Sequence, residues 1–262
     1  MQWTILKSEC EMREVIDLIP TSLCTVVYPD AFPSPPDESM PFDGADGNWL
    51  ADEFEPAFQQ SWFYYLSEIA YRRISNRITH TLYSEPPTAW LAYPRGQLYR
   101  LAQELEAQVE AAASHLPFPI EEQTPPEPPN ELRYMLSARA LELRERVWRP
   151  FLFTAIHAEE GAFQDPQTEE CAALALSLVF QGIEQFRIKH RHHGSWYAAR
   201  QGFANALMVL AAAKSGRFEL REDWVSMVTL VQSHLRYWEA EAPDLRSARM
   251  ILQETMENSR PP

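Results

Sequence analysis

The chain contains 262 residues, 45% of them hydrophobic, and has a formal net charge of -14 and a sequence pI of about 5.0. This acidity disfavours a nucleic-acid-binding protein, because clustered Lys and Arg side chains usually bind the phosphate backbone. Three scattered cysteines are too few for a disulfide framework or a cysteine-rich metal module. No uncharged apolar run reaches the roughly 18 residues of a membrane span. We therefore expect a cytoplasmic protein.

The first part of the chain, residues 1–52, differs in composition from the rest. A short amphipathic stretch ends at Pro20, and a strip rich in proline, aspartate and glycine follows it. Such a strip has too few apolar residues to form a core of its own. We expect a boundary near residue 52, with a helical body over residues 53–262.

The body is predicted to be all-α. Its apolar residues recur every three or four positions, and no alternating run of the kind typical of β-strands is present. We expect a single-domain helical bundle of about seven to nine helices, linked by proline-rich loops. The main expected helices cover residues 54–83, 95–115, 131–157, 168–188, 195–214, 224–241 and 245–256.

The expected helix over residues 131–157 carries Pro150 and a dense set of arginines. Pro150 should kink this helix or start a new one, because proline lacks the amide hydrogen that a helix needs. The arginines are interpreted mainly as a solvated face. An ion-pair set with Glu142 and Glu145, or donors lining a cleft, are the alternatives.

The stretch over residues 190–214 organises the predicted bundle. Its alanines are small enough to let neighbouring helices approach closely, so it is predicted to be the central helix. Ser195 is expected to cap the first turn with its side chain. A cationic, histidine-rich run at residues 189–193 comes just before it, and three further polar or aromatic residues follow: Trp196, Tyr197 and Arg200.

This histidine-rich flank has two main interpretations. It is either a solvated loop or the edge of a ligand pocket beside a helix N-terminus. A metal site is disfavoured, because the spacing of His190, His192 and His193 matches none of the strong zinc patterns and no cysteine lies nearby in sequence.

Sequence signatures of common enzyme classes are absent from the chain. There is no dinucleotide-binding glycine fingerprint, phosphate-binding loop, serine-nucleophile elbow or zinc-protease motif. We therefore expect no cofactor and no metal. What remains is a set of aromatic and hydrogen-bonding residues. Each of them alone is typical of core packing, but together they could line an apolar small-molecule pocket.

Four segments resemble the regulatory domain that follows the zinc cluster in fungal binuclear-cluster transcription factors. They occur in the family's order and are WFYYLSEIAYRRISNRI (62–78), ARALELRERVWRPFLFTAIH (138–157), HRHHGSWYAARQGFANALMVLAAA (190–213) and LRYWEAEAPDLRSARMIL (235–252). The proline-rich stretch YPDAFPSPP (28–36) is similar to the approach to that domain. The resemblance implies an all-helical domain that senses effectors or restrains the activator.

The chain departs from this family at its N-terminus. The six closely spaced cysteines and the basic residues of the DNA-reading module are missing. A fragment, a truncated regulator working through partners and a sensing domain recruited to another task all remain open. Because the chain begins with Met and lacks the DNA-binding part, we expect a sensing domain that has been recruited to another task. We expect a nuclear location only if the protein is a regulator.

The preferred functional hypothesis is a cofactor-independent enzyme of fungal secondary metabolism. It would bind an apolar conjugated polyketide or terpenoid and promote a cyclisation or cycloaddition of the hetero-Diels–Alder type. This assignment is made by elimination, because such chemistry needs only a near-attack geometry and donors where charge develops. The alternatives are an effector-binding regulatory domain that does not bind DNA directly, and a helical scaffold without a ligand. A homodimer is left open.

The candidate site residues fall into two groups. The catalytic candidates would activate a carbonyl or quinone methide oxygen by hydrogen bonding, and they are His192, His193, Tyr197 and Arg200. The substrate-binding candidates would line the pocket and stack on a conjugated ligand, and they are Tyr65, Tyr134, Arg139, Trp148, His157 and Trp196.

Overall fold

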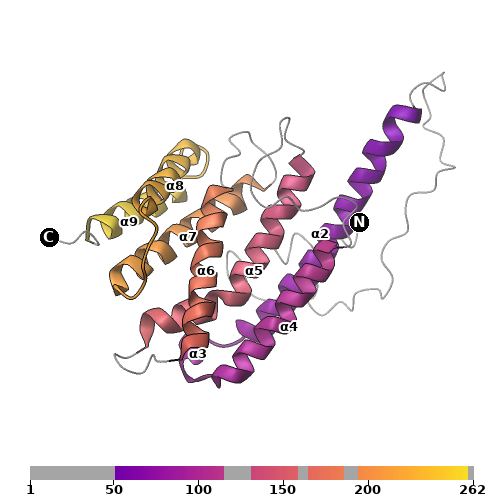
Figure 1. Cartoon of the computed structure of the whole chain (residues 1–262). Helices are drawn as coiled ribbons and strands as arrows, with labels where there is room; N and C mark the ends of the chain where they lie inside the picture. The colour runs from indigo at the N-terminus through magenta and orange to yellow at the C-terminus, as the bar shows by residue number, and fades with distance from the viewer. Residues whose placement is uncertain (1–50, 115–130, 159–164, 186–193, 259–262) are drawn as a thin grey trace. The chain divides into compact units, whose positions relative to one another are not determined.

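The computed structural model describes residues 51–114, 131–158, 165–185 and 194–258, with the side chains of residues 51–60 and of residue 131 left out. These ranges contain eight helices and no strand, which confirms the predicted all-α class (Figure 1). The helices are α2 (Ala51–Leu82), α3 (Ala89–Ala92), α4 (Arg95–Ser114), α5 (Glu131–His157), α6 (Pro166–Glu184), α7 (Ser195–Ser215), α8 (Trp224–Trp238) and α9 (Asp244–Asn258). The predicted N-terminal strip and its boundary near residue 52 cannot be compared in full, because residues 1–50 lie outside the described ranges.

The predicted helices agree with the observed ones to within a few residues. The largest difference is at the C-terminal end of α6, which stops at Glu184; α8 stops at Trp238 and α2 starts at Ala51, each closer to its predicted end. The short helix α3 was not predicted, because four residues between prolines are too few to show a helical period. Its Trp90 is buried, and the indole Nε1 donates to the Leu82 carbonyl at the end of α2 over 2.7 Å.

Local sequence signals explain several helix ends. Asp165 is the N-cap of α6, where its side chain accepts from the Gln167 amide (3.3 Å) and from the Thr168 hydroxyl (2.6 Å), and proline follows it at the first helical position. The C-terminal end of α7 is capped by Gly216, which has a φ of 64°, the left-handed conformation that glycine adopts most easily.

The described residues belong to two compact units, and each unit is built from segments that are discontinuous in sequence. Unit 1 comprises Met1–Arg77 and Ala107–Ala140, and unit 2 comprises Ile78–Glu106 and Leu141–Pro262. The division therefore falls within α2, α4 and α5, which is not where a linker would be sought from composition. In unit 1 the core positions come from all three of these helices and include Ile69, Tyr71, Val109 and Leu136.

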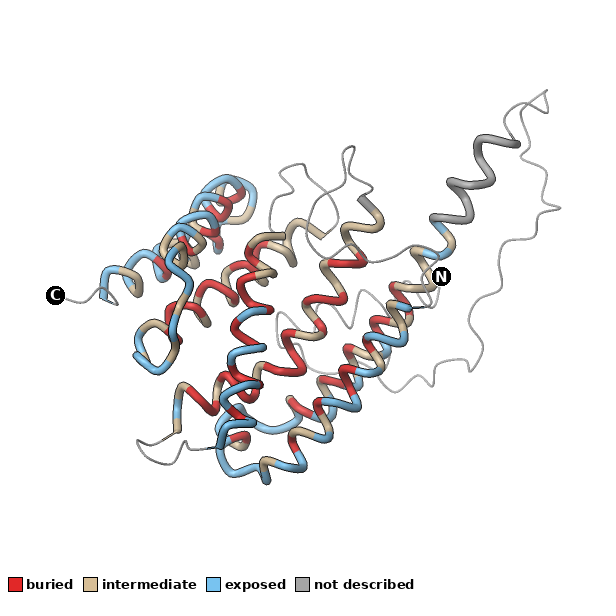
Figure 2. Tube along the Cα trace, viewed as in Figure 1, coloured by how far each residue is buried: buried red, intermediate tan, exposed pale blue. Residues whose placement is uncertain are grey.

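In unit 2, α7 contacts α6, α8 and α9, and these four helices lie side by side (Figure 1). Buried positions recur along α6 and α7 at helical spacing, whereas the outward turns of α8 and α9 are exposed (Figure 2). Among α6–α9, the predicted central position is thus confirmed for α7, while residues 190–193 of the predicted stretch lie outside the described ranges. Three alanines of α7, Ala199, Ala206 and Ala212, are at most 1% exposed, so small side chains form part of its buried surface.

A glycine and an amide side chain pack together where α6 meets α7. A Cβ at Gly182 of α6 would overlap the side-chain amide of Asn205 on α7. Asn205 is only 2% exposed, and its Oδ1 accepts from Gln201 Nε2 over 3.2 Å. The close approach of the two helices therefore requires glycine at position 182 or a displaced Asn205.

Every helix within the described ranges is too short or too polar to cross a lipid bilayer.

Candidate functional site

The first two turns of α7 bring together three of the predicted site residues. The rings of Trp196 and Tyr197 meet edge to face, with centroids 5.0 Å apart and an interplanar angle of 87°. The Arg200 guanidinium lies over the Trp196 ring, with its Cζ 3.4 Å from the ring centroid. This spacing of four residues places the two side chains on the same face of a helix. We name Trp196, Tyr197 and Arg200 the α7 cluster.

The Arg200 side chain is held by two polar contacts. Its Nη1 donates to the Trp196 carbonyl over 3.2 Å, and its Nη2 donates to Oδ2 of Asp244, the first residue of α9. The Arg200 side chain is 22% exposed and that of Asp244 is 58% exposed. The cation is therefore mostly covered by protein, while its carboxylate partner is mostly in water.

Burial dominates the electrostatics of Arg200. Removal of the guanidinium from water lowers the pKa of Arg200, and the charge and hydrogen bond of Asp244 offset this only in part. The net pKa of Arg200 is lower than usual. It remains a cation at neutral pH, because an arginine pKa lies far above 7. What the α7 cluster offers a ligand is thus a positioned cation beside two partly exposed aromatic rings.

Two predictions at this helix start have different outcomes. The N-cap position of α7 is Gly194 and Ser195 is the first helical residue, so Ser195 does not occupy the N-cap position expected of a capping serine. His192 and His193 lie outside the described residues, so their catalytic roles stay predictions.

Trp148 and His157 lie elsewhere in unit 2, both on α5. Trp148 is buried against Tyr99 and Phe151, with ring centroids 6.3 and 5.7 Å away, and its Nε1 donates to Glu106 Oε2 over 3.1 Å. Glu106 also accepts from Arg144 Nε, at 2.5 Å. Trp148 thus joins α5 to α4 through packing and a charge-assisted hydrogen bond.

His157 is the last residue of α5 and is exposed. Its ring is 4.2 Å from that of Phe153, which in turn meets Trp90 at 5.4 Å. The structure therefore places it at the C-terminal end of α5, where Arg217 donates to the Ala155 and Ala158 carbonyls over 2.8 and 2.5 Å.

The remaining predicted residues, Tyr65, Tyr134 and Arg139, belong to unit 1. Tyr65 packs on Trp62 with ring centroids 5.8 Å apart, and Arg139 Nε lies 4.0 Å from the buried carboxylate of Glu68. All three are half-buried. The α7 cluster thus belongs to unit 2, and these three residues belong to unit 1.

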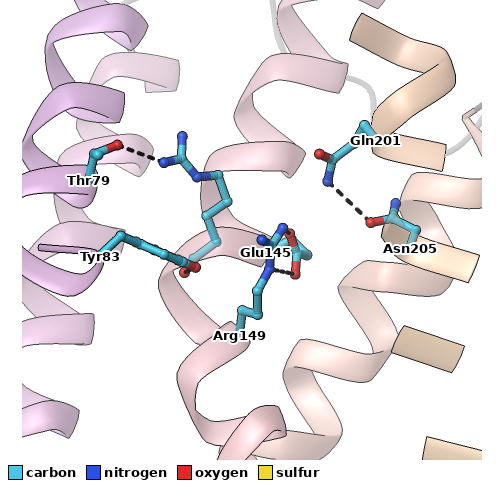
Figure 3. Close-up of polar contacts among 7 residues, drawn as sticks. Thr79, Tyr83, Glu145, Arg149, Gln201 and Asn205 are labelled. Atoms are coloured by element: carbon cyan, nitrogen blue, oxygen red, sulfur yellow. Dashed lines mark hydrogen bonds and ion pairs between the residues drawn. The ribbon is translucent and has the colours of Figure 1, made fainter. Parts of the chain in front are cut away.

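The interpretation of the α5 arginines as a solvated face is wrong for three of them. Arg144 pairs with Glu106, and Arg149 forms a two-pronged pair with Glu145, from Nε to Oε1 at 2.8 Å and from Nη2 to Oε2 at 2.5 Å (Figure 3). Arg146 is 8% exposed and donates from Nη2 to the Thr79 hydroxyl over 2.7 Å. The reason is that α5 is buried on several sides, so its cations need partners.

Pro150 is also accommodated within α5, which continues through it to His157. Proline at this position leaves the Arg146 carbonyl without its helical donor. The Tyr83 hydroxyl replaces that donor and reaches the Arg146 carbonyl over 2.6 Å (Figure 3). Burial raises the pKa of Tyr83, so the hydroxyl stays protonated and able to donate. We name Tyr83, Glu145, Arg146 and Arg149 the α5 clamp.

Sequence reasoning missed Asp244 and Asn205. Asp244 lies 44 positions after Arg200, and an aspartate at the start of a helix is already explained by favourable interaction with the helix dipole. Asn205 lies in a run of small and apolar residues, so the helical pattern does not single it out. Its helical spacing from Gln201 was the only local signal.

Comparison with known proteins gives no match, either to a family model, to a characterised protein or to a solved structure. The resemblance to the fungal regulatory domain therefore stays a prediction. Among the described residues, no group of three or more His, Cys, Asp or Glu side chains is arranged to hold a metal ion. The chemistry available at the α7 cluster is thus hydrogen bonding, charge stabilisation and stacking.

Proposed function

We propose that the protein binds an apolar, conjugated small molecule at the α7 cluster and promotes its cyclisation or cycloaddition without a cofactor. The observation that carries this proposal is the stacking of Arg200 on the partly exposed ring of Trp196, 3.4 Å from guanidinium carbon to ring centroid. A planar ligand gains from such a surface, because rings and a delocalised cation favour flat conjugated partners.

Each residue of the cluster has a role in this proposal. Trp196 and Tyr197 contact the conjugated part of the ligand and limit its orientations. Arg200 donates a hydrogen bond to a carbonyl or enolate oxygen, where negative charge grows as the new bonds form. A pericyclic reaction needs no nucleophile, so orientation and charge stabilisation suffice to accelerate it.

An effector-binding regulatory protein is the second candidate, and one observation favours it. The Arg200 to Asp244 ion pair connects the start of α7 with the start of α9. A ligand that engages Arg200 would change this connection between the two helices. A binding event would then be converted into a change at α9 without any turnover.

The experiment is a thermal-shift survey of the purified protein with conjugated polyketide and terpenoid metabolites, followed by mass spectrometry of each mixture. Ligands that stabilise the wild type are retested with Trp196→Ala. The matched control is Tyr237→Ala, which removes another partly exposed ring in an edge-to-face pair, 4.9 Å from Trp238.

We expect Trp196→Ala to weaken binding about tenfold or more, and Tyr237→Ala to leave it unchanged, since a buried aromatic contact contributes on the order of 1–2 kcal/mol. A new product that forms faster with the wild type than with Trp196→Ala supports the enzyme. Stabilisation without a product supports the regulator. Equal binding by both variants would contradict the assignment of the site to the α7 cluster.

A further inference from the structure

We propose that the Asp244 carboxylate binds the Arg200 guanidinium where an acidic group of the ligand binds once the ligand is present. The ligands of this site are then conjugated anions, such as aryl carboxylates or enolates. This inference rests on the proposed function and specifies its ligand class. Asp244 would act as an internal competitor that leaves the guanidinium when the ligand arrives. Three structural observations lead to this assignment.

The first observation is the geometry of the ion pair. Arginine and a carboxylate bind most strongly through two parallel hydrogen bonds. In unit 2, Arg149 forms such a pair with Glu145, and Arg221 forms one with Asp223, through Nε and Nη2 at 3.0 and 2.9 Å. Among the described residues, Arg200 gives Asp244 only the single donor Nη2. The Arg200 guanidinium can therefore donate a second hydrogen bond to the acidic group of a ligand.

The second observation is the contrast in exposure between the two partners. With 58% of its side chain exposed, Asp244 can turn into water at little cost in solvation. Arg200 is fixed from two sides, by the Trp196 ring and by the Trp196 carbonyl. An exchange of carboxylates therefore moves Asp244 and leaves the cation in place.

The third observation is the aromatic surface around the cation. Trp196 lies under the guanidinium, and Tyr197 meets Trp196 at right angles. An anion that carries a ring can contact these side chains, whereas a small anion such as acetate cannot. The net charge of -14 repels anions in general, so only an anion with additional contacts would accumulate here. This selects conjugated acids over inorganic ions.

The test uses 2-naphthoate, its neutral analogue 2-naphthamide and acetate, with affinities measured by isothermal titration calorimetry. The test variant is Asp244→Asn. The control is Glu184→Gln, because Glu184 forms an ion pair with Arg221 at 2.7 Å in the same unit. Asparagine is accepted at the start of a helix, so α9 should still form, and circular dichroism checks this. Asp244→Ser provides a second substitution of the same kind.

We expect the wild type to bind 2-naphthoate more tightly than 2-naphthamide and not to bind acetate measurably. Asp244→Asn should tighten 2-naphthoate binding about two- to fivefold, the contribution of one exposed ion pair, and leave 2-naphthamide unaffected. Glu184→Gln should change neither affinity.

Other outcomes would overturn the inference. If Asp244→Asn leaves 2-naphthoate binding unchanged or weaker, Asp244 is not a competitor and the ion pair is structural. If 2-naphthamide binds as well as 2-naphthoate, the ligand class is wrong while the proposed binding function stands. If acetate binds as tightly as 2-naphthoate, the rings have no role. If none of the three probes binds, neither the inference nor the proposed site at the α7 cluster is supported.

Discussion

Two arginine–carboxylate pairs in unit 2 differ in nearly every property that determines whether an ion pair is structural. In the α5 clamp, Arg149 and Glu145 share two hydrogen bonds, and the Glu145 side chain is 2% exposed. Arg200 of the α7 cluster shares one hydrogen bond with Asp244 of α9, and the Asp244 side chain is 58% exposed. The first pair lies within one helix, and the second joins α7 to α9.

The pKa values of the two arginines show what this difference means. Burial lowers the pKa of both. At Arg149 the charge and hydrogen bonds of Glu145, together with the nearby Tyr83 and Glu142, outweigh burial, so the net pKa is raised. At Arg200 the charge of Asp244 compensates only in part, so the net pKa is lowered. The protein therefore compensates for the burial of Arg149 more completely than for that of Arg200.

The largest predicted contrast comes from removing each carboxylate. Glu145→Ala leaves a mostly buried guanidinium without its counter-ion and should reduce the free energy of unfolding by about 3 kcal/mol. Asp244→Ala removes an exposed partner and should reduce it by less than about 1 kcal/mol. Urea denaturation of both variants at neutral pH measures the difference. Equal losses would mean that the two pairs have the same structural role.

A smaller effect is expected from the tyrosine in the α5 clamp. Tyr83→Phe removes the donor to the Arg146 carbonyl, and we expect a loss of about 1–2 kcal/mol in the free energy of unfolding. Tyr71→Phe in unit 1 is the matched control, because Tyr71 is buried but its hydroxyl makes no hydrogen bond to any described residue.

Tyr71→Phe should leave the free energy of unfolding unchanged or raise it slightly, because a buried hydroxyl without a partner costs free energy. Burial, with the nearby Glu68 carboxylate, raises the pKa of Tyr71 to about 12, so this hydroxyl is neutral under the conditions of the test. Denaturation of both Phe variants compares them directly. A larger loss for Tyr71→Phe than for Tyr83→Phe would show that the clamp does not depend on its hydroxyl.

Helical periodicity was sufficient to predict most of the fold. The helix predicted over residues 131–157 agrees with α5 at both ends, and the glycine after α7 agrees with the observed C-cap. The division into two units was not predictable, because it passes through α2, α4 and α5 without any change in composition. Periodicity reports which face of a helix is buried but not which other segment covers it.

The candidate site was predicted in part. Trp196, Tyr197 and Arg200 are close in sequence at helical spacing, so their contact could be anticipated. Asp244 could not be, because its contact with Arg200 depends on how α9 packs on α7. Arg144 and Arg146 were misassigned for a similar reason, since their partners Glu106 and Thr79 come from distant segments. The Arg149 pair with Glu145 lies within one helix and agrees with the ion-pair alternative.

The most direct test of the account follows the side chains of the two arginines themselves. Nuclear magnetic resonance of nitrogen-15-labelled protein records the Nε–H signals of Arg149 and Arg200, which Arg149→Lys and Arg200→Lys assign by removing one signal each. We expect added 2-naphthoate to shift the Arg200 signal, the same concentration of 2-naphthamide to shift it less, and Arg149 to respond to neither. An unchanged Arg200 signal at high 2-naphthoate concentration, or an equal shift of Arg149, would contradict the claim that Arg200 is the cation available to a ligand.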